Sequence, residues 1–357
     1  MIVYIALLLV TTTAALLVVK QETLPARGMS RQMFVNRISL CAIFLLLFAV
    51  SAARYYVGND YGRYEEHFYN IWYGYVVPTE RGFNVLVKCL QTLFGKDNYL
   101  FLFAFFAFIT VFVSLKALYT LSSSFVFSFY LFMAFGYYYQ SLNTVRYYVA
   151  IAFALCAIPY LFRKSYAKFV LMVLLGALIH KSALIVLPVY LLADCRWRIW
   201  QAALLTAFAA SGFVFGDVYL KVILYLYPTY RNTMYLEGGT SYINIARCLL
   251  VLLFCLSVYR DTIKEDRQLL FYFRLNAAAL LLYLCGSFLP EVSRIGTYMT
   301  VTQVFLLPGV ALKIPDKQKR RIAVIGVAAF GAVYFAAFLY KAYGELVKLL
   351  PYHTWLF

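Results

Sequence analysis

The sequence predicts an all-α, polytopic integral membrane protein, and three observations support this fold class. Apolar residues make up 64% of the 357 residues, and charged residues make up only 13%. A soluble domain carries about 25% charged residues. The apolar residues also fall into long runs, most of them close to the length of about 20 residues that crosses a bilayer as a helix.

These runs, taken in chain order, predict about 11–12 transmembrane helices in a single transmembrane domain covering residues 1–357. The first run lacks a positively charged start and a small-residue cleavage site, so we expect a transmembrane helix there instead of a cleaved signal peptide. The runs fall at about 1–19, 38–53, 98–119, 124–141, 144–162, 168–193, 199–216, 241–259, 268–287, 295–312 and 322–340.

The distribution of basic residues predicts how the chain is threaded. If 168–193 crossed once, the cluster Lys317–Arg321 would lie outside while Lys20–Arg37 lay inside, against the excess of basic residues in cytoplasmic loops. A break at His180–Ser182 restores the rule and leaves 19 of the 32 basic residues inside. We therefore expect a broken or hairpin segment with His180 near its outer end, and both termini outside.

Composition also excludes several classes of function. The net charge of +17 resides in short loops, where membrane orientation and anionic lipid explain it better than nucleic acid does. The seven cysteines form no CxxC pair, so we predict neither a metal site nor a disulfide framework. Walker A, GxSxG and HExxH motifs are absent, and no cofactor is expected.

Two longer outer loops are predicted, at 54–98 and at 217–240. In the first, residues 83–94 form a helical pattern that we expect to lie on the membrane surface. Its apolar face comprises Phe83, Leu86, Val87, Leu90 and Phe94.

Strong polar residues gather on the predicted outer side. Charges within or at the lip of membrane helices are costly and mark functional sites by default. Several cations on one face indicate a site for a polar, anionic substrate. The candidates are Arg54, Asp60, Glu80, Asn143, Arg146, His180, Arg231, Glu291 and Arg294.

Each motif also has a structural alternative. Arg54 and Asp60 flank a turn at Gly58 that either binds a ligand or is a solvated helix end. Arg146 shares a predicted helical face with Asn143 in the first turn of a helix, where it either binds an anion or pairs with an acid on another helix.

The same choice applies to the later motifs. His180 is either structural or, as a neutral imidazole, takes a proton from a hydroxyl. Glu291 and Arg294 lie three apart, so they either bind substrate or pair with each other.

The ordered set of motifs resembles the EpsG family of Wzy-like bacterial polysaccharide polymerases, most densely over residues 54–190. Tyr147 departs from the pattern, in which a Gln follows the arginine. The matching residues are Arg54, Gly58, Asp60 and Tyr61, then Glu80 to Phe83, Asn143, Arg146 and Ala150, Arg163-Lys164, and finally His180 and Ser182.

The resemblance implies a glycosyltransferase with a GT-C-like architecture at the outer face of the bacterial inner membrane. Such enzymes transfer a growing glycan from undecaprenyl pyrophosphate to a sugar hydroxyl of an incoming lipid-linked repeat unit. The implied partners are the lipid-linked donor and acceptor and membrane lipid, together with a flippase and a chain-length regulator.

The resemblance and the chemistry together assign expected roles. Arginine suits a pyrophosphate leaving group, so Arg54, Arg146 and Arg294 are expected to bind it. His180 is the first choice for the base and Asp60 the second, while Glu80 and Glu291 would orient sugar hydroxyls or arginines. Asn143 and Arg231 complete the expected substrate contacts. The alternative functions are a flippase for the lipid-linked sugar and a membrane O-acyltransferase that decorates the polysaccharide.

Overall fold

A computed structural model describes residues 1–20, 30–226, 242–286, 288–289, 292–344 and 347–356. Its regular elements over these ranges are helices, and a single isolated β-bridge joins Arg54 to Thr354. Six of the described helices are long and apolar enough to cross a membrane, and one bent helix pair would be a seventh span. The predicted all-α, polytopic membrane fold is confirmed.

The chain divides into two compact units, and the single transmembrane domain predicted from composition stays a prediction. The first unit comprises residues 1–184 and 321–357, and the second comprises residues 185–320. Each unit is described by itself.

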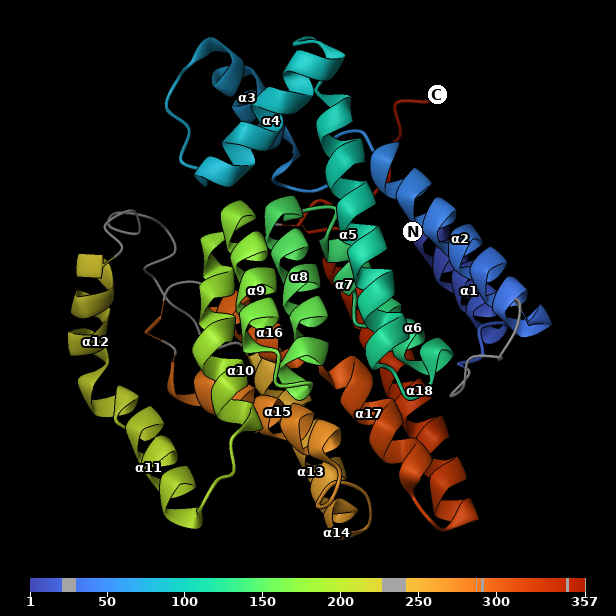
Figure 1. The fold of residues 1–357 in the computed structure, drawn as a ribbon, viewed down its shortest axis with the longest axis vertical. Helices are drawn as coiled ribbons and strands as arrows, with labels where there is room; N and C mark the ends of the chain where they lie inside the picture. Colours follow the sequence, from blue (N-terminus) through green and yellow to red (C-terminus); the bar gives the residue numbers. More distant parts are fainter. Residues whose placement is uncertain (21–29, 227–241, 287, 290–291, 345–346, 357) are drawn as a thin grey trace. The chain divides into compact units, whose positions relative to one another are not determined.

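The first unit is built around α5, α8 and α9, with α2 packed against α5 (Figure 1). Most of α18 also belongs to this unit. Its helices are α1 (Ile2–Leu16), α2 (Arg31–Ala52), α3 (Tyr61–Tyr73), α4 (Arg81–Phe94), α5 (Leu100–Leu121), α6 (Phe125–Ala134), α7 (Tyr137–Gln140), α8 (Val145–Phe162), α9 (Tyr166–Ile179) and α18 (Lys317–Lys341).

Helices α3 and α4 form a cap across one end of this bundle (Figure 1). Phe83 and Val87 of α4 are fully buried, and they share an apolar core with Phe68 of α3, Phe106 of α5 and Val149 of α8. The predicted helix at 83–94 is therefore confirmed, with Phe83, Val87 and Leu90 of its apolar stripe packed against protein. Its placement at a membrane surface stays a prediction.

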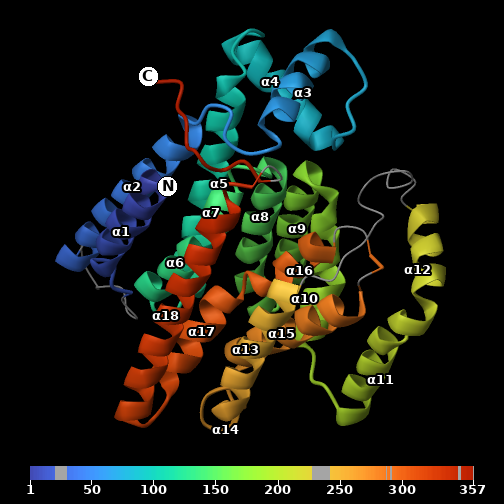
Figure 2. The same cartoon turned by 180° about the vertical axis from the view of Figure 1, so that it is seen from behind.

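The two ends of the first unit can be told apart by the residues that lie there. At the end away from the cap, Lys20 Nζ donates hydrogen bonds to the carbonyl oxygens of Thr120 (2.9 Å) and Ser122 (2.7 Å). Lys20 belongs to the basic residues that were predicted to face the inside. The C-terminus lies at the cap end (Figure 2). We call this second end the cap end.

The second unit is organised around α15, which packs against α10, α11, α13, α16 and α17. The bent pair is α11 and α12, with an angle of 71° between them. The helices are α10 (Val186–Asp194), α11 (Ile199–Ala210), α12 (Gly212–Leu226), α13 (Tyr242–Ser257), α14 (Tyr259–Thr262), α15 (Arg267–Cys285), α16 (Val292–Thr300) and α17 (Gln303–Lys313).

Two further sequence predictions, a break in the run 168–193 and an outer loop at 217–240, can be compared with the helices. The run 168–193 is broken as predicted: α9 ends at Ile179, His180 is extended (φ −150°, ψ 108°), and a 3-10 turn covers Lys181–Ile185. Within the predicted outer loop at 217–240, the residues as far as Leu226 are helical. Most of its remainder, including Arg231, lies outside the described residues.

Candidate functional site

The cap end of the first unit holds five of the predicted site residues, in two hydrogen-bonded groups, one around Glu80 and one between Asp60 and Asn143. These are Asp60, Glu80, Asn143, Arg146 and His180, contributed by segments up to 120 positions apart in the sequence. We call this group the polar site.

Glu80 is the central acceptor of the polar site. It precedes α4, and its Oε2 accepts a hydrogen bond from Nη1 of Arg146. Its Oε1 accepts from the backbone N–H of Lys181 at 3.0 Å, immediately after the break at His180. One carboxylate therefore fixes both the arginine and the broken helix. Of the two interpretations of Arg146, the structure shows the pair with an acid on another segment, and an anion contact stays a prediction.

Arg146 lies in the first turn of α8, between the cap and the bundle. Its guanidinium carbon lies 5.2 Å from the ring centroid of Phe83 and 6.0 Å from that of Tyr64. The hydroxyl of Tyr64 also accepts a hydrogen bond from the backbone N–H of Arg146, with 3.3 Å between the nitrogen and the oxygen. Among the described residues, the buried Nε of Arg146 has no hydrogen-bond partner. The aromatic rings thus hold the guanidinium in place, and Glu80 accepts a hydrogen bond from only some of its N–H groups.

His180 ends α9, and its ring is oriented by local contacts. Its Nδ1 lies 2.8 Å from the Ser182 hydroxyl and 3.4 Å from the Ser182 backbone N. The ring also packs edge-on against Tyr147, with 5.6 Å between centroids. A backbone N–H can only donate, so this geometry favours Nδ1 as an acceptor and Nε2 as the protonated nitrogen.

The loop that carries Asp60 is docked on the turn before α8. The backbone N–H of Asp60 donates to Oδ1 of Asn143 at 3.0 Å. Gly58 has φ +97°, and a Cβ there would lie 2.9 Å from the Asn143 Cα and from the Leu142 carbonyl oxygen. Glycine is thus required both for conformation and for space.

The predicted shared helical face of Asn143 and Arg146 is wrong. Helix α8 begins at Val145, after Thr144 with φ −98° and ψ 71°, so Asn143 lies in the preceding turn. Its side-chain amide oxygen is committed to the loop of Asp60. Asn143 is therefore positioned by the turn before α8, and Arg146 by the helix itself.

Arg54 is buried at the cap end, with 1% of its surface exposed. Its Nη1 donates to the carbonyl oxygen and hydroxyl of Ser51, and its guanidinium lies 4.6 Å from the ring centroid of Phe103. Burial lowers the pKa of Arg54 to about 10, so the residue stays charged at neutral pH. This placement fits a fixed positive charge better than a direct substrate contact.

The C-terminal segment holds this loop in place, and the sequence motifs did not predict it. Backbone N–H groups of Tyr55 and Gly58 donate to the carbonyl oxygens of His353 (3.0 Å) and Lys348 (2.8 Å). The Tyr352 hydroxyl donates to the Val50 carbonyl oxygen at 2.8 Å. Residues 347–356 therefore clasp the loop between Arg54 and Asp60 from the far end of the chain.

His67 is a second residue that the motifs missed. It lies one turn after Tyr64 on α3, and its buried Nδ1 has no hydrogen-bond partner among the described residues. Burial, together with the charge of Arg146, lowers its pKa. The signal was present in the spacing of Tyr61, Tyr64, Phe68 and Ile71, all buried on one face of α3.

The remaining predicted residues lie elsewhere. Arg294 belongs to the second unit, in the first turn of α16. Glu291 and Arg231 lie outside the described residues. Within the described ranges, no group of three or more His, Cys, Asp or Glu side chains is placed to hold a metal ion.

Comparison with known proteins identifies the family. The model of the EpsG family matches residues 37–354, a range that contains every residue of the polar site. No curated protein and no solved structure matches the chain. Because the match covers nearly the whole chain, this multi-pass membrane protein belongs to the EpsG family of Wzy-like polysaccharide polymerases.

Proposed function

We propose that this protein joins lipid-linked oligosaccharide repeat units at the outer face of the bacterial inner membrane. In this reaction an acceptor sugar hydroxyl attacks the anomeric carbon of the donor glycan. The bond from that carbon to undecaprenyl pyrophosphate breaks, and the hydroxyl proton passes to a base. The site therefore needs fixed cations for the pyrophosphate and an acceptor for one proton.

Arg146 is the observation that carries this proposal. It is a cation held by Glu80 and two aromatic rings, in the first turn of α8, with only 18% of its side chain exposed. Preorganised charge in a shielded site stabilises a leaving group more than a mobile surface charge does. Arg54 adds a second fixed positive charge at the same end of the unit.

The geometry of His180 supports a division of roles that differs from the one expected from sequence. With Nδ1 accepting from Ser182, Nε2 carries a proton and donates, which suits a phosphate or sugar oxygen. Asp60 then becomes the first choice for the base. Among the described residues, its carboxylate makes no hydrogen bond to the start of α3, and Arg63 lies 4.0 Å from it.

The proposal is tested with purified protein in nanodiscs and a synthetic undecaprenyl-pyrophosphate repeat unit, without any nucleotide sugar. The expected product is a ladder spaced by whole repeat units. Arg146→Ala should slow ladder formation by about 10²–10³-fold and Asp60→Asn should slow it as well, whereas Lys88→Ala, at an exposed position of α4, should leave it unchanged.

Two outcomes would contradict the proposal. Wild-type protein that moves the lipid-linked unit between leaflets without lengthening it would identify a flippase. A ladder of normal length and rate from the Arg146→Ala variant would remove the polar site from the reaction.

A further inference from the structure

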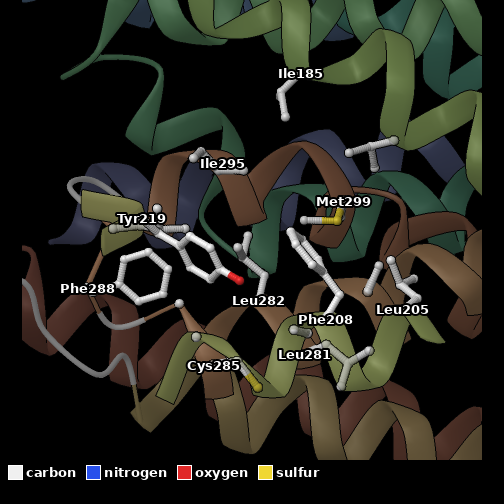
Figure 3. A pocket seen from close by; sticks show the side chains of 16 residues that line it. Ile185, Leu205, Phe208, Tyr219, Leu281, Leu282, Cys285, Phe288, Ile295 and Met299 are labelled. Carbon is white, nitrogen blue, oxygen red and sulfur yellow. The ribbon is translucent and has the colours of Figure 1, made fainter. Parts of the chain in front are cut away.

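The second unit contains an apolar cavity of about 420 Å³ between α10, α11, α12, α15 and α16. Phe208, Tyr219, Leu282, Phe288 and Met299 contribute to its wall (Figure 3). This volume lies within the range of about 300–1,000 Å³ that is typical of small-molecule sites. None of the candidate polar residues lines it.

The wall of the cavity offers hydrocarbon and aromatic surface. The rings of Phe208, Tyr219 and Phe288 form a continuous row, with centroid distances of 5.9 Å and 5.8 Å. The Tyr219 hydroxyl is hydrogen-bonded to the Ser211 hydroxyl at 2.8 Å, so this polar group of the wall already has a partner within the protein. Such a surface suits a hydrocarbon chain, and it offers no hydrogen-bonding groups to the hydroxyls of a sugar.

The bend between α11 and α12 builds this cavity. A Cβ at Gly212 would lie 2.7 Å from the Cys285 carbonyl oxygen, and one at Gly216 would lie 3.2 Å from the Phe288 ring. The two glycines thus let α12 approach the end of α15 closely. On the same helix, Phe213, Val214 and Val218 expose more than half of their surface, as expected for a helix in contact with lipid.

A helix that lines the cavity also carries a cation. Helix α16 supplies Ile295 and Met299 to the wall, and Arg294 directly precedes Ile295 in the first turn. An apolar chain site with an arginine on one of its lining helices is complementary to a lipid that carries phosphate on a long hydrocarbon chain.

We propose that this cavity holds part of the hydrocarbon chain of a polyprenyl phosphate, with Arg294 binding the phosphate. This assignment rests on the proposed function for the identity of the lipid. Because membrane lipid tails are as apolar as the wall, the hydrophobic effect gives the chain little net gain on entering. The cavity instead selects by shape and fixes where the chain lies.

The test uses a photoreactive undecaprenyl phosphate in phosphatidylcholine nanodiscs, with crosslinks mapped by mass spectrometry. The expected crosslinks fall on α11, α15 and α16. Ala209→Phe and Ala278→Phe fill the cavity from two walls and should each lower labelling about tenfold. Ala207→Phe, at an exposed position of α11 outside the lining, is the matched control and should label normally.

Arg294→Gln tests the phosphate contact without changing the volume of the cavity. It should lower labelling by undecaprenyl phosphate and leave labelling by a photoreactive undecaprenol unchanged. Equal labelling of this variant and wild type by undecaprenyl phosphate would remove Arg294 from the assignment. Thermal unfolding in detergent confirms that each variant is folded before its labelling is compared.

Three results separate this assignment from the proposed function. Crosslinks outside the cavity, or labelling unaffected by both filling variants, would overturn the cavity assignment while the wild-type ladder still formed. Equal labelling by photoreactive phosphatidylglycerol would make the cavity a site for membrane phospholipid, and would also overturn it. Normal labelling without a ladder from wild-type protein would overturn the polymerase and leave the lipid site standing.

Discussion

The polar site of the first unit depends on directional hydrogen bonds between distant segments, whereas the cavity of the second unit depends on close packing. At the polar site, Glu80 connects Arg146 to the backbone of Lys181, and Asn143 connects to the loop of Asp60. In the cavity, rings and glycine contacts form the wall.

This difference separates the expected consequences of substitution. A hydrogen bond is lost when one atom is removed, whereas apolar packing tolerates changes that conserve volume. Polar-site variants should therefore lower kcat on any lipid-linked substrate. Cavity variants should weaken binding of a long-chain polyprenyl phosphate and leave kcat nearly unchanged.

The largest effect should come from Arg146→Ala. Removing one preorganised charge from a shielded site costs about 10²–10³ in kcat, and the carboxylate of Glu80 loses its cation. The rate of ladder formation measures the loss. The double variant Arg146→Ala with Glu80→Gln should recover stability but not activity. Recovery of activity would mean that the pair is only structural.

A chain that ends at Leu350 tests whether the C-terminal clasp positions the polar site. It loses the hydrogen bonds of Tyr352, His353 and Trp355 to residues 50–55. We expect kcat to fall by roughly tenfold, since four hydrogen bonds of about 1 kcal/mol each no longer hold residues 50–55. Labelling of the cavity should persist. Loss of labelling as well would show that the effect is not confined to the first unit.

Tyr352→Phe is the milder version of the same test, because it removes one hydroxyl and keeps the ring. It should lower kcat less than the truncation does. A shift in KM without a change in kcat would argue against a positioning role.

Two glycines four positions apart give effects of opposite sign. Gly58→Ala places a side chain at φ +97° against the backbone of Asn143, and should destabilise the protein by more than about 1 kcal/mol. Gly62→Ala, on the open side of α3, should stabilise it by about 1 kcal/mol through helix propensity. Thermal unfolding in detergent measures both. Equal shifts would contradict the close docking of the loop.

The smallest effect concerns the pH dependence of stability through His67. Its pKa is lowered in the folded protein, so the unfolded chain binds the proton more readily. The stabilisation is complete above the unfolded pKa of about 6.5 and decreases as the pH falls below it. His67→Gln should flatten this decrease when unfolding is followed between pH 5 and 7. An unchanged slope would show that His67 does not contribute.

The parts of the fold that were predicted from sequence are those that local pattern controls. The apolar period over 83–94 predicted α4, and the charge balance around 168–193 predicted the break at His180. Helix α3 was missed because its apolar positions are largely tyrosines among charged residues. The start of α8 after Thr144 depends on the docked loop of Asp60, which no local pattern contains.

The sequence by itself determined that the chain is an all-α membrane protein and that its charged residues collect at predicted helix ends. Burial in a bilayer imposes helix length and penalises charge, and both constraints act on local composition. Only the tertiary structure decided that Glu80 pairs with Arg146, that the C-terminus clasps the loop of Arg54, and that α12 closes on α15. These contacts join positions far apart in the chain, so their energies depend on three-dimensional distance, which periodicity and charge counts do not encode.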